Sequence, residues 1–270
     1  MNLYLSSLSN FLITVLFFCL AGLSVAASAE RSDKTNGKLR FALVSTEEPP
    51  FIYSDSEHEL TGIVPSLAQA LSRDLVLELE YVPISRKGLE QGIRSGKADV
   101  AWLSPDWVEN KQQLIFSTPI FSHQEFLYSL SPFAESHLPL DWVKGKTICI
   151  RQDYQYPSLS RFFAKNLARS VEVSNQVPLL QLLLKGRCDL LYMNEHRTSW
   201  MISRLGIKHL VWRSAEPLKK TNLALMFNPE WQSQMSKINQ ALINIKHSGE
   251  LDAIIQTHVH PAVLSKTTPD

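Results

Sequence analysis

Two stretches of the chain carry the same order of apolar and polar positions. Residues 85–95 have apolar positions at helical spacing, and residues 98–103 form a mostly apolar run after a short break; residues 177–184 and 190–193 repeat that order. A glycine after a helix takes the left-handed C-cap conformation at little steric cost, and a short apolar run after a turn indicates a buried strand. Each stretch therefore predicts a helix, a turn and a buried strand. Both turns hold a glycine and, three residues later, an aspartate: Gly96 with Asp99 and Gly186 with Asp189.

The strands that open the two parts of the chain match as well. Residues 37–44 begin with Gly-Lys and continue into an apolar-rich run, and residues 145–150 do the same. Gly-Lys is a common pair, so chance is the alternative, but two matches in the same order in each part favour an internal repeat. We therefore expect two α/β lobes, each with its own doubly wound sheet. A single sheet running through both Val100 and Leu190 would contradict that expectation.

The remaining hydrophobic pattern predicts further helices and strands. Apolar positions three and four residues apart indicate amphipathic helices, and alternating or short continuous apolar runs indicate strands. The predicted helices are 66–71, 108–113, 158–168, 197–205, 230–248 and 251–257, and the predicted strands are 75–82, 126–130, 170–173, 208–212 and 223–227.

The N-terminal stretch differs from the rest of the chain. Residues 1–29 contain no charged side chain, and the apolar run 11–25 is followed by Ala27-Ser28-Ala29. A short apolar run before an Ala-x-Ala site is typical of a secretory signal peptide, and a membrane anchor, the alternative, needs about 20 apolar residues. We therefore expect residues 1–29 to be a signal peptide and residues 31–36 a polar leader. The protein is then located in the periplasm.

Composition and motifs argue against several function classes. The 27 Lys and Arg side chains balance 26 Asp and Glu, and no basic run indicates a nucleic-acid surface. Neither Gly-x-Ser-x-Gly nor His-Glu-x-x-His occurs. His258 and His260 could form a metal pair, but a lone pair near a chain end is more often a surface feature. We expect no catalytic residues, no metal and no cofactor, and a binding protein rather than an enzyme.

Two cysteines, Cys149 and Cys188, remain after the expected signal peptide is removed. They lie at the first and third predicted strands of the second lobe, which are neighbours in a doubly wound sheet. In an oxidising compartment the two can form a disulfide, and two buried free thiols are the alternative. A Cα separation above about 7 Å would exclude the disulfide.

Six short segments in order along the chain resemble the polar-amino-acid type of bacterial solute-binding protein, called family 3. The resemblance implies a type II periplasmic-binding-protein fold, with two lobes joined by crossing strands near Phe126 and Thr221. Lobe 1 would comprise residues 38–125 and 222–262, and lobe 2 residues 126–221. The segments are Pro49-Pro50-Phe51-Ile52-Tyr53, Leu60-Thr61-Gly62-Ile63, Gly96-Lys97-Ala98-Asp99-Val100, Phe116-Ser117-Thr118-Pro119, Gly145-Lys146-Thr147-Ile148 and Ser248-Gly249-Glu250-Leu251.

The resemblance also implies a function, from which this sequence departs at specific positions. Members of the family close on a small polar solute, amino-acid-like or another small carboxylate, and deliver it to an inner-membrane ABC permease or a sensor receptor. We expect a monomer. In amino-acid binders an arginine holds the ligand carboxylate where this chain has Lys111, an aspartate holds the α-amino group where it has Asn194, and an aromatic residue stacks where it has Arg86. A lysine does not reproduce the bidentate arginine fork, so the usual α-amino-acid clamp looks broken.

Seven residues near the ends of predicted strands are the candidate ligand contacts: Glu48, Arg86, Ser104, Lys111, Tyr154, Tyr156 and Asn194. In open α/β sheets the ligand crevice lies at the carboxyl ends of the strands. Each residue also has a structural alternative, such as a turn or cap role for Ser104, and we expect at least one of the two tyrosines to pack on its lobe. By the same reasoning Asp99 and Asp189, at strand starts, are structural.

The charges of the candidate residues bear on the ligand class. Arg86 and Lys111 favour an anionic or zwitterionic solute, whereas Glu48 and Asp106 could neutralise them. A small periplasmic lyase or dehydratase of the same fold, with Glu48 or Asp106 as acid or base, is the alternative function.

Overall fold

The computed structural model describes residues 37–44, 47–134 and 139–260. The expected signal peptide, the leader and residues 261–262 of the expected first lobe lie outside these ranges. Within them, no helix is long and apolar enough to cross a membrane.

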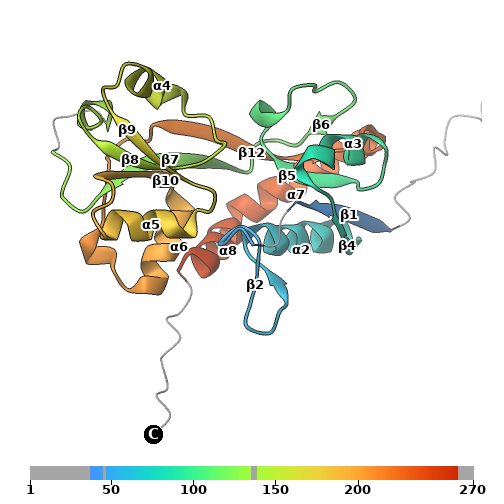
Figure 1. Ribbon diagram of the computed structural model, residues 1–270. Coiled ribbons are helices and arrows are strands. Elements are labelled where there is room, and N and C mark those ends of the chain that lie inside the picture. The colour runs from blue at the N-terminus through green and yellow to red at the C-terminus, as the bar shows by residue number, and fades with distance from the viewer. Residues whose placement is uncertain (1–36, 45–46, 135–138, 261–270) are drawn as a thin grey trace, which may run out of the picture. The chain divides into compact units, whose positions relative to one another are not determined.

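The first strand group begins with three parallel strands, β4 (Glu78–Pro83), β1 (Lys38–Leu43) and β5 (Val100–Leu103). The C-terminal end of β12 (Lys219–Phe227) pairs antiparallel with β5, and β6 (Ile115–Phe116) pairs with β12. A separate hairpin joins β2 (Tyr53–Ser54) and β3 (Leu60–Thr61). Helices lie on both faces of this group, α3 on one and α2 and α7 on the other (Figure 1). The helices are α2 (Ile63–Leu75), η1 (Arg86–Gly88), α3 (Leu89–Arg94), η2 (Pro105–Trp107), η5 (Pro229–Gln234), α7 (Met235–His247) and α8 (Glu250–Val259).

The second strand group has the order β7 (Phe121–Ser129), β10 (Leu190–Asn194), β8 (Thr147–Arg151) and β9 (Arg169–Val173). Strands β10, β8 and β9 are parallel, whereas β7 runs antiparallel to β10 and pairs with the edge strand β11 (Trp212–Arg213). Helix α4 covers one face, and α5 and α6 cover the other (Figure 1). The helices are η3 (Pro139–Trp142), α4 (Pro157–Ala164), α5 (Val177–Leu184), α6 (Glu195–Leu205) and η4 (Lys208–Leu210).

One hydrogen-bonded strand path connects the two groups, in the order β4-β1-β5-β12-β7-β10-β8-β9. The expectation of two separate sheets is therefore wrong, because a single path runs through Val100 and Leu190. The physical reason is the length of the connecting strands. Residues Lys219–Leu223 of β12 pair with β7, while Ala224–Phe227 pair with β5, so each end of β12 serves a different group.

The buried apolar side chains nevertheless form separate cores. Two clusters lie on the two faces of the first strand group and two on the faces of the second. In the described part of the chain, none of these clusters contains buried residues from both groups. We call the first group with α2, α3, α7 and α8 the first half, and β8 to β11 with α4 to α6 the second half; β7 and β12 connect them.

The internal repeat predicted from the sequence is present in the backbone hydrogen bonds. Gly96 and Gly186 have φ of +72° and +64°. In the first half, the Asp99 amide donates to the Arg40 carbonyl oxygen (2.8 Å), and the Arg40 amide donates to Asp99 Oδ2 (2.8 Å). In the second half, Asp189 and Thr147 make the same reciprocal pair, at 2.8 and 2.7 Å. Each aspartate therefore joins the starts of two parallel strands, and the structural role expected for both is confirmed.

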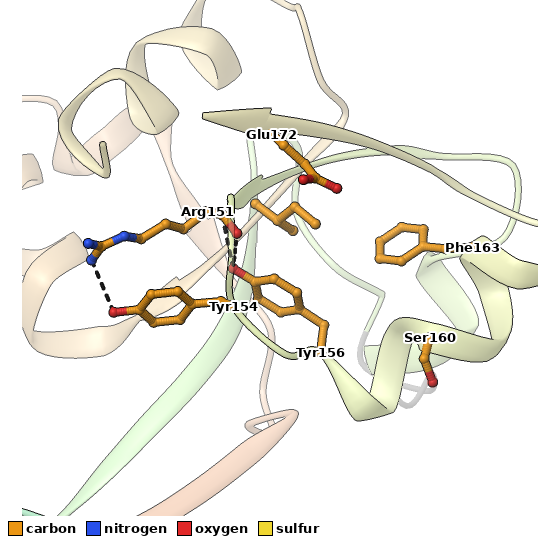
Figure 2. Close-up of a pocket in the computed structure, with 7 residues that line it drawn as sticks. Arg151, Tyr154, Tyr156, Ser160, Phe163 and Glu172 are labelled. Atoms are coloured by element: carbon orange, nitrogen blue, oxygen red, sulfur yellow. Dashed lines mark hydrogen bonds between the residues drawn. The ribbon is translucent and has the colours of Figure 1, made fainter. Parts of the chain in front are cut away.

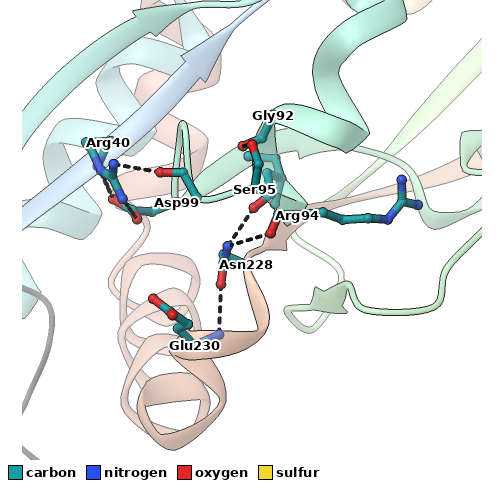
Figure 3. Close-up of polar contacts among 9 residues, drawn as sticks. Arg40, Gly92, Arg94, Ser95, Asp99, Asn228 and Glu230 are labelled. Atoms are coloured by element: carbon teal, nitrogen blue, oxygen red, sulfur yellow. Dashed lines mark hydrogen bonds and ion pairs between the residues drawn. The ribbon is translucent and has the colours of Figure 1, made fainter.

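Asp99 has a second role that Asp189 lacks. The Arg40 guanidinium donates to Asp99 from Nε (3.0 Å) and Nη2 (2.6 Å), and from Nη1 to the Gly96 carbonyl oxygen (2.7 Å) (Figure 3). Asn228, just after β12, donates its side-chain amide to the Ile93 carbonyl oxygen (2.6 Å) and accepts from the Glu230 amide (2.9 Å). This network ties the end of α3 and the start of η5 to the β1–β5 pair.

Three predicted elements differ from the structure. The expected helix 108–113 is an irregular segment with one turn at residues 112–113, because Arg94 donates to the carbonyl oxygens of Asn110 and Gln112 and this stretch has little apolar surface to bury. The expected strand 208–212 is the 3₁₀ turn η4 followed by the two-residue β11. The expected helix 230–248 begins as the 3₁₀ segment η5, with Pro229 at its first turn, and becomes α-helical only from Met235.

The disulfide between Cys149 and Cys188 is confirmed, with a Cα separation of 5.7 Å. Cys149 lies in β8, and Cys188 lies just before β10, the parallel neighbour of β8. The bond therefore joins the middle of β8 to the segment that enters β10, inside the core of the second half.

Removing the disulfide should destabilise the second half. It closes a loop across a sequence separation of 39 residues, for which the chain-entropy model gives about 4 kcal/mol. We expect the double variant Cys149→Ala/Cys188→Ala to unfold in guanidinium with a free energy lower by up to about 4 kcal/mol. Under reducing conditions, wild type and variant should converge, and equal stability under oxidising conditions would contradict the prediction.

The two equivalent aspartates should respond differently to the same substitution. Asp99→Asn removes a buried carboxylate that accepts three hydrogen bonds from Arg40, so we expect a loss of about 1–3 kcal/mol in unfolding free energy. Asp189→Asn is the matched control, because within the described residues its side chain accepts a hydrogen bond from the Thr147 amide alone. Equal losses at both positions in urea unfolding would refute the added role of Arg40.

Candidate functional site

A charged cluster joins the two halves at the carboxyl ends of three strands. Glu48 follows β1, Arg151 is the last residue of β8, and Arg197 lies in the first turn of α6, directly after β10. Glu48 Oε2 accepts from Arg197 Nη2 at 2.6 Å, and Glu48 Oε1 accepts from Arg151 Nη1 at 3.3 Å. We call Glu48, Arg151, Tyr154 and Arg197 the Glu48 cluster. Its formal charge is one positive unit, since two guanidinium groups share one carboxylate.

The loop that carries Glu48 is tightly constrained. The Glu48 amide donates to the Ile52 carbonyl oxygen (2.7 Å), and the Phe51 amide donates to the Glu48 carbonyl oxygen (2.9 Å), around a cis Pro49-Pro50 bond. Gly62 is required beside this loop, because its φ is +123° and a Cβ there would lie 2.5 Å from the Phe51 carbonyl oxygen. The loop therefore packs directly on the start of α2, and this fixes the position of Glu48.

The position of Arg197 is set by the cap of α6. Asn194 accepts from the Arg197 amide through Oδ1 (3.2 Å) and donates through Nδ2 to the Gln124 carbonyl oxygen (3.1 Å). A cation in the first turn of a helix is electrostatically unfavourable, and Arg197 is also buried, with 8% of its surface exposed. Burial lowers the pKa of Arg197, and the nearby carboxylate of Glu48 opposes that shift. Glu48 therefore compensates a charge that is otherwise poorly placed.

Aromatic rings lie around this cluster and come from both halves and from β7. Phe51 lies 5.8 Å from His123 and 6.0 Å from His196, between ring centroids. Trp107 lies 5.9 Å from His123, and Phe121 lies 5.3 Å from His196. Burial lowers the pKa of His123 to about 3 and that of His196 to about 4. Both rings are therefore neutral near pH 7, and their buried Nδ1 atoms have no hydrogen-bond partner among the described residues.

The two tyrosines predicted as contacts take different positions (Figure 2). The Tyr154 ring lies under the Arg151 guanidinium, with 4.7 Å between Cζ and the ring centroid, and its hydroxyl accepts from Arg151 Nη1 at 3.1 Å. Tyr156 instead accepts from the Arg151 amide and donates to its carbonyl oxygen, both at 2.9 Å, and packs on Tyr192. Tyr156 therefore packs on the second half, as expected of at least one of the pair.

A small cavity of about 210 Å³ lies behind this loop. Figure 2 shows the Arg151 guanidinium directed toward Tyr154 and away from Phe163 and Glu172, which bound the cavity. The cavity thus shares Arg151 and Tyr154 with the Glu48 cluster and extends from them toward Phe163 and Glu172 of the second half. Its lining residues are Ile150, Arg151, Tyr154, Tyr156, Ser160, Phe163 and Glu172.

Of the seven predicted contacts, Glu48 and Tyr154 lie in the Glu48 cluster. Asn194 caps α6 next to it, with both of its polar atoms bonded to backbone. Ser104 is fully buried, and its hydroxyl accepts from the Asp106 amide at 3.1 Å, which is the cap role given as its alternative.

The two predicted cations lie outside the cluster. Arg86 donates to the Trp107 carbonyl oxygen (3.0 Å) and pairs with Glu90 at 3.4 Å. Lys111 lies in an exposed turn. Neither Arg86 nor Lys111 pairs with Glu48. The positive charge of the Glu48 cluster comes from Arg151 and Arg197 instead.

Sequence reasoning did not single out Arg151, Arg197, His123 or His196. A usable signal existed for Arg151, because it directly follows a predicted strand of the second half, whereas Arg197 lies in a predicted helix, four residues after the strand that ends at Met193. For the histidines no local signal existed, since their environment is made by Phe51 and Trp107 from distant loops.

A metal site has no support in the described part of the chain. No group of three or more metal-binding side chains occurs there. His258, expected at the surface, is buried at 8% exposed: Ser66 Oγ lies 2.8 Å from its Nε2, and the Tyr53 hydroxyl lies 3.2 Å from its Nδ1. His260 is exposed. The histidine pair is thus split, and His258 connects α8 to α2 and β2.

Solved structures with the same fold define the class of protein. The fold matches that of YckB from Bacillus subtilis (20% identity, TM-score 0.70, 88% of this chain and 95% of that one) and that of an ancestral cationic amino acid solute-binding protein (19%, 0.67, 83% and 96%). It also matches part of the periplasmic domain of BvgS from B. pertussis (21%, 0.58, 83% and 43%). The chain therefore has the mixed α/β fold of type II periplasmic binding proteins. No curated protein sequence matches it.

The family follows from the sequence itself. Residues 41–261 match the model of bacterial extracellular solute-binding proteins, family 3, and the chain belongs to that family. The resemblance drawn from its short segments is confirmed.

The buried histidines should make stability depend on pH. An unfolded histidine has a pKa near 6.5, whereas His123 and His196 have values of about 3 and 4. Between pH 6.5 and 4 the unfolded state thus binds more protons, so the free energy of unfolding should fall as the pH falls and be retained in full above pH 6.5. Each group contributes up to about 1.4 kcal/mol per pH unit.

The double variant His123→Gln/His196→Gln isolates this contribution. Other groups titrate in the same range, among them Glu125 and Glu195, whose pKa values burial raises. Those groups are common to both proteins, so the difference in slope of unfolding free energy between pH 7 and 4 reports the histidines alone. Identical slopes in urea titrations would contradict the prediction.

Proposed function

We propose that this protein binds a small polar solute, amino-acid-like or another small carboxylate, between its two halves by hinge closure, for ABC-type uptake or for sensing. The observation that carries the proposal is the Glu48 cluster, in which a carboxylate of the first half contacts two arginines of the second. Membership of a solute-binding family supports it, as do relatives that include the second substrate-binding domain of a putative amino acid ABC transporter and a sensor's periplasmic domain.

The connecting strands suit a hinge. β7 and β12 pair with each other through Phe121–Glu125 and Lys219–Leu223, and the apolar cores lie on either side of them. A twist of these strands can change the angle between the halves without opening a core. Residues 38–125 with 222–262, and residues 126–221, would then move as two lobes.

Packing of α6 on α8, ion pairs and ring contacts hold the halves together. Apart from the connecting strands, these include the Glu48 cluster, the rings around Phe51, and the neighbouring Tyr53 and Trp200, whose centroids are 6.3 Å apart. Ion pairs and ring contacts can break and re-form at lower cost than a packed core.

The alternative function, a lyase or dehydratase with Glu48 or Asp106 as acid or base, has less support. Both Glu48 oxygens accept from arginines, and Asp106 lies on an exposed turn after β5. Turnover is therefore an outcome of the experiment below rather than a second proposal.

Solute screening combined with scattering tests the proposal. We expect a small polar solute to raise the melting temperature of the exported protein in a saturable manner, because a ligand that binds only the folded state stabilises it by RT ln(1 + [L]/Kd). The same solute should reduce the radius of gyration in X-ray scattering.

Two variants serve as a matched pair in this test. Arg197→Gln removes a residue of the Glu48 cluster and should abolish the rise in melting temperature that the solute causes. Arg73→Gln removes an exposed arginine paired with Asp74 and Glu250 and should leave that rise unchanged. Conversion of the solute to a product would favour the lyase, and binding without any scattering change would refute hinge closure.

A further inference from the structure

We propose that the free edge of Arg151 is an anion subsite and that the solute is an acid without an ammonium group. This inference rests on the proposed function and narrows its ligand class. It assigns the main anion contact to the second half of the molecule, in a residue that the usual amino-acid clamp does not use.

The two arginines of the Glu48 cluster are held with different strength. The Arg197–Glu48 distance is 2.6 Å, whereas Arg151 reaches Glu48 at 3.3 Å and Tyr154 at 3.1 Å. Charge-assisted N–H···O bonds are strongest near 2.7–2.9 Å. Glu48 is therefore primarily the partner of Arg197, and its contact with Arg151 is the weaker of the two.

The Arg151 guanidinium has N–H donors that make no hydrogen bond within the described residues. In the described part of the chain, both hydrogen bonds of its side chain come from Nη1, and Nε and Nη2 donate to no acceptor. Nε and Nη2 form the edge of a guanidinium that matches a carboxylate bidentately. The Arg151 side chain is also more exposed than that of Arg197, at 24% against 10%. Arg151 can thus receive a ligand while Arg197 stays paired with Glu48.

The charge around this edge favours an anion. The cluster carries one uncompensated positive charge, and the neighbouring His123 and His196 are neutral near pH 7 because burial lowers their pKa values. One carboxylate on the solute would neutralise the site. Tyr154 covers one face of the guanidinium and restricts its orientation.

An ammonium group finds no ready acceptor beside this edge. Glu48 is shared by two arginines, and Asn194 uses both polar atoms on the backbone. Glu125 accepts from the Tyr192 hydroxyl, and Glu195 pairs with Arg213. Glu172, which accepts from Ser170 Oγ at 3.2 Å, lies on the side of Arg151 away from its guanidinium (Figure 2). Within the described residues, this leaves the exposed Asp106 and Asp153 as the carboxylates on which an ammonium group would have to rely.

The experiment uses matched solutes with one side chain and three head groups: an α-amino acid, the corresponding 2-hydroxy acid and the 2-hydroxy carboxamide. Alanine, lactate and lactamide form one set, and phenylalanine, phenyllactate and phenyllactamide another. Calorimetry on the wild-type protein should give tighter binding of the hydroxy acid than of either companion, by at least about tenfold over the amide, which lacks the charge.

Variants then locate the subsite. Arg151→Gln should weaken hydroxy-acid binding by at least about 30-fold and remove the preference over the amide, and Arg151→Lys should recover only part of the loss because it keeps the charge without the fork. Tyr154→Phe, an exposed position at which folding is not at risk, should give a smaller loss. Arg73→Gln and Asp106→Asn should leave hydroxy-acid binding unchanged.

The outcomes separate this inference from the proposed function. A solute that binds equally well to wild type and Arg151→Gln would refute the subsite and leave the binding function in place. Preference for the amino acid over the hydroxy acid would refute the absence of an ammonium group, and loss of that preference in Asp106→Asn would identify its acceptor. A protein that binds no member of any set, and no other solute in the wider screen, would overturn both.

Discussion

A buried guanidinium that needs a carboxylate is the constraint on which the centre of this molecule depends. Arg197 is buried in the first turn of α6, where the helix dipole disfavours a cation. Removing a charge from water costs several kcal/mol unless a well-placed partner compensates it. The partner, Glu48, lies 149 positions earlier in the chain and in the other half. The pair therefore couples the start of α6 to the loop after β1, and it brings Phe51 of that loop against His123 and His196.

The molecule combines one strand path with separate cores, and this combination has a mechanical consequence. Hydrogen bonds run without interruption from β4 to β9, because β12 pairs with β5 at one end and with β7 at the other. The buried apolar clusters lie on either side of that connection. Changing the twist of a strand pair costs less than exposing a close-packed interior. The connection thus resists separation of the halves and permits their rotation, as the proposed hinge requires.

The departures from the amino-acid clamp form a consistent pattern. Where the family pattern has an arginine, the chain has Lys111 on an exposed turn, and where it has an aspartate, Asn194 caps a helix. Compared with amino-acid binders of the family, the first half thus supplies less positive charge around the Glu48 cluster, and the second half supplies less negative charge. In this protein the positive charges come from the second half, from Arg151 and Arg197, and the negative charge comes from Glu48 of the first half.

The sequence by itself determined the features that depend on local pattern. A glycine followed by an aspartate three residues later is enough to predict the turn before β5 and before β10, because glycine takes the left-handed conformation that ends a helix at little cost. The same reasoning placed Cys149 and Cys188 on adjacent strands. Chain order at strand ends also indicated Glu48 and Tyr154.

Only the tertiary structure decided features that depend on residues far apart in the chain. Residues 108–113 are irregular because Arg94 binds the carbonyl oxygens of Asn110 and Gln112, and the two expected sheets are connected because β12 is long enough to reach both groups. Arg197 has no local signature that separates it from a solvent-exposed helix residue. Its burial and its partner arise only when the loop after β1 packs against α6, so its place in the site became visible in the folded molecule alone.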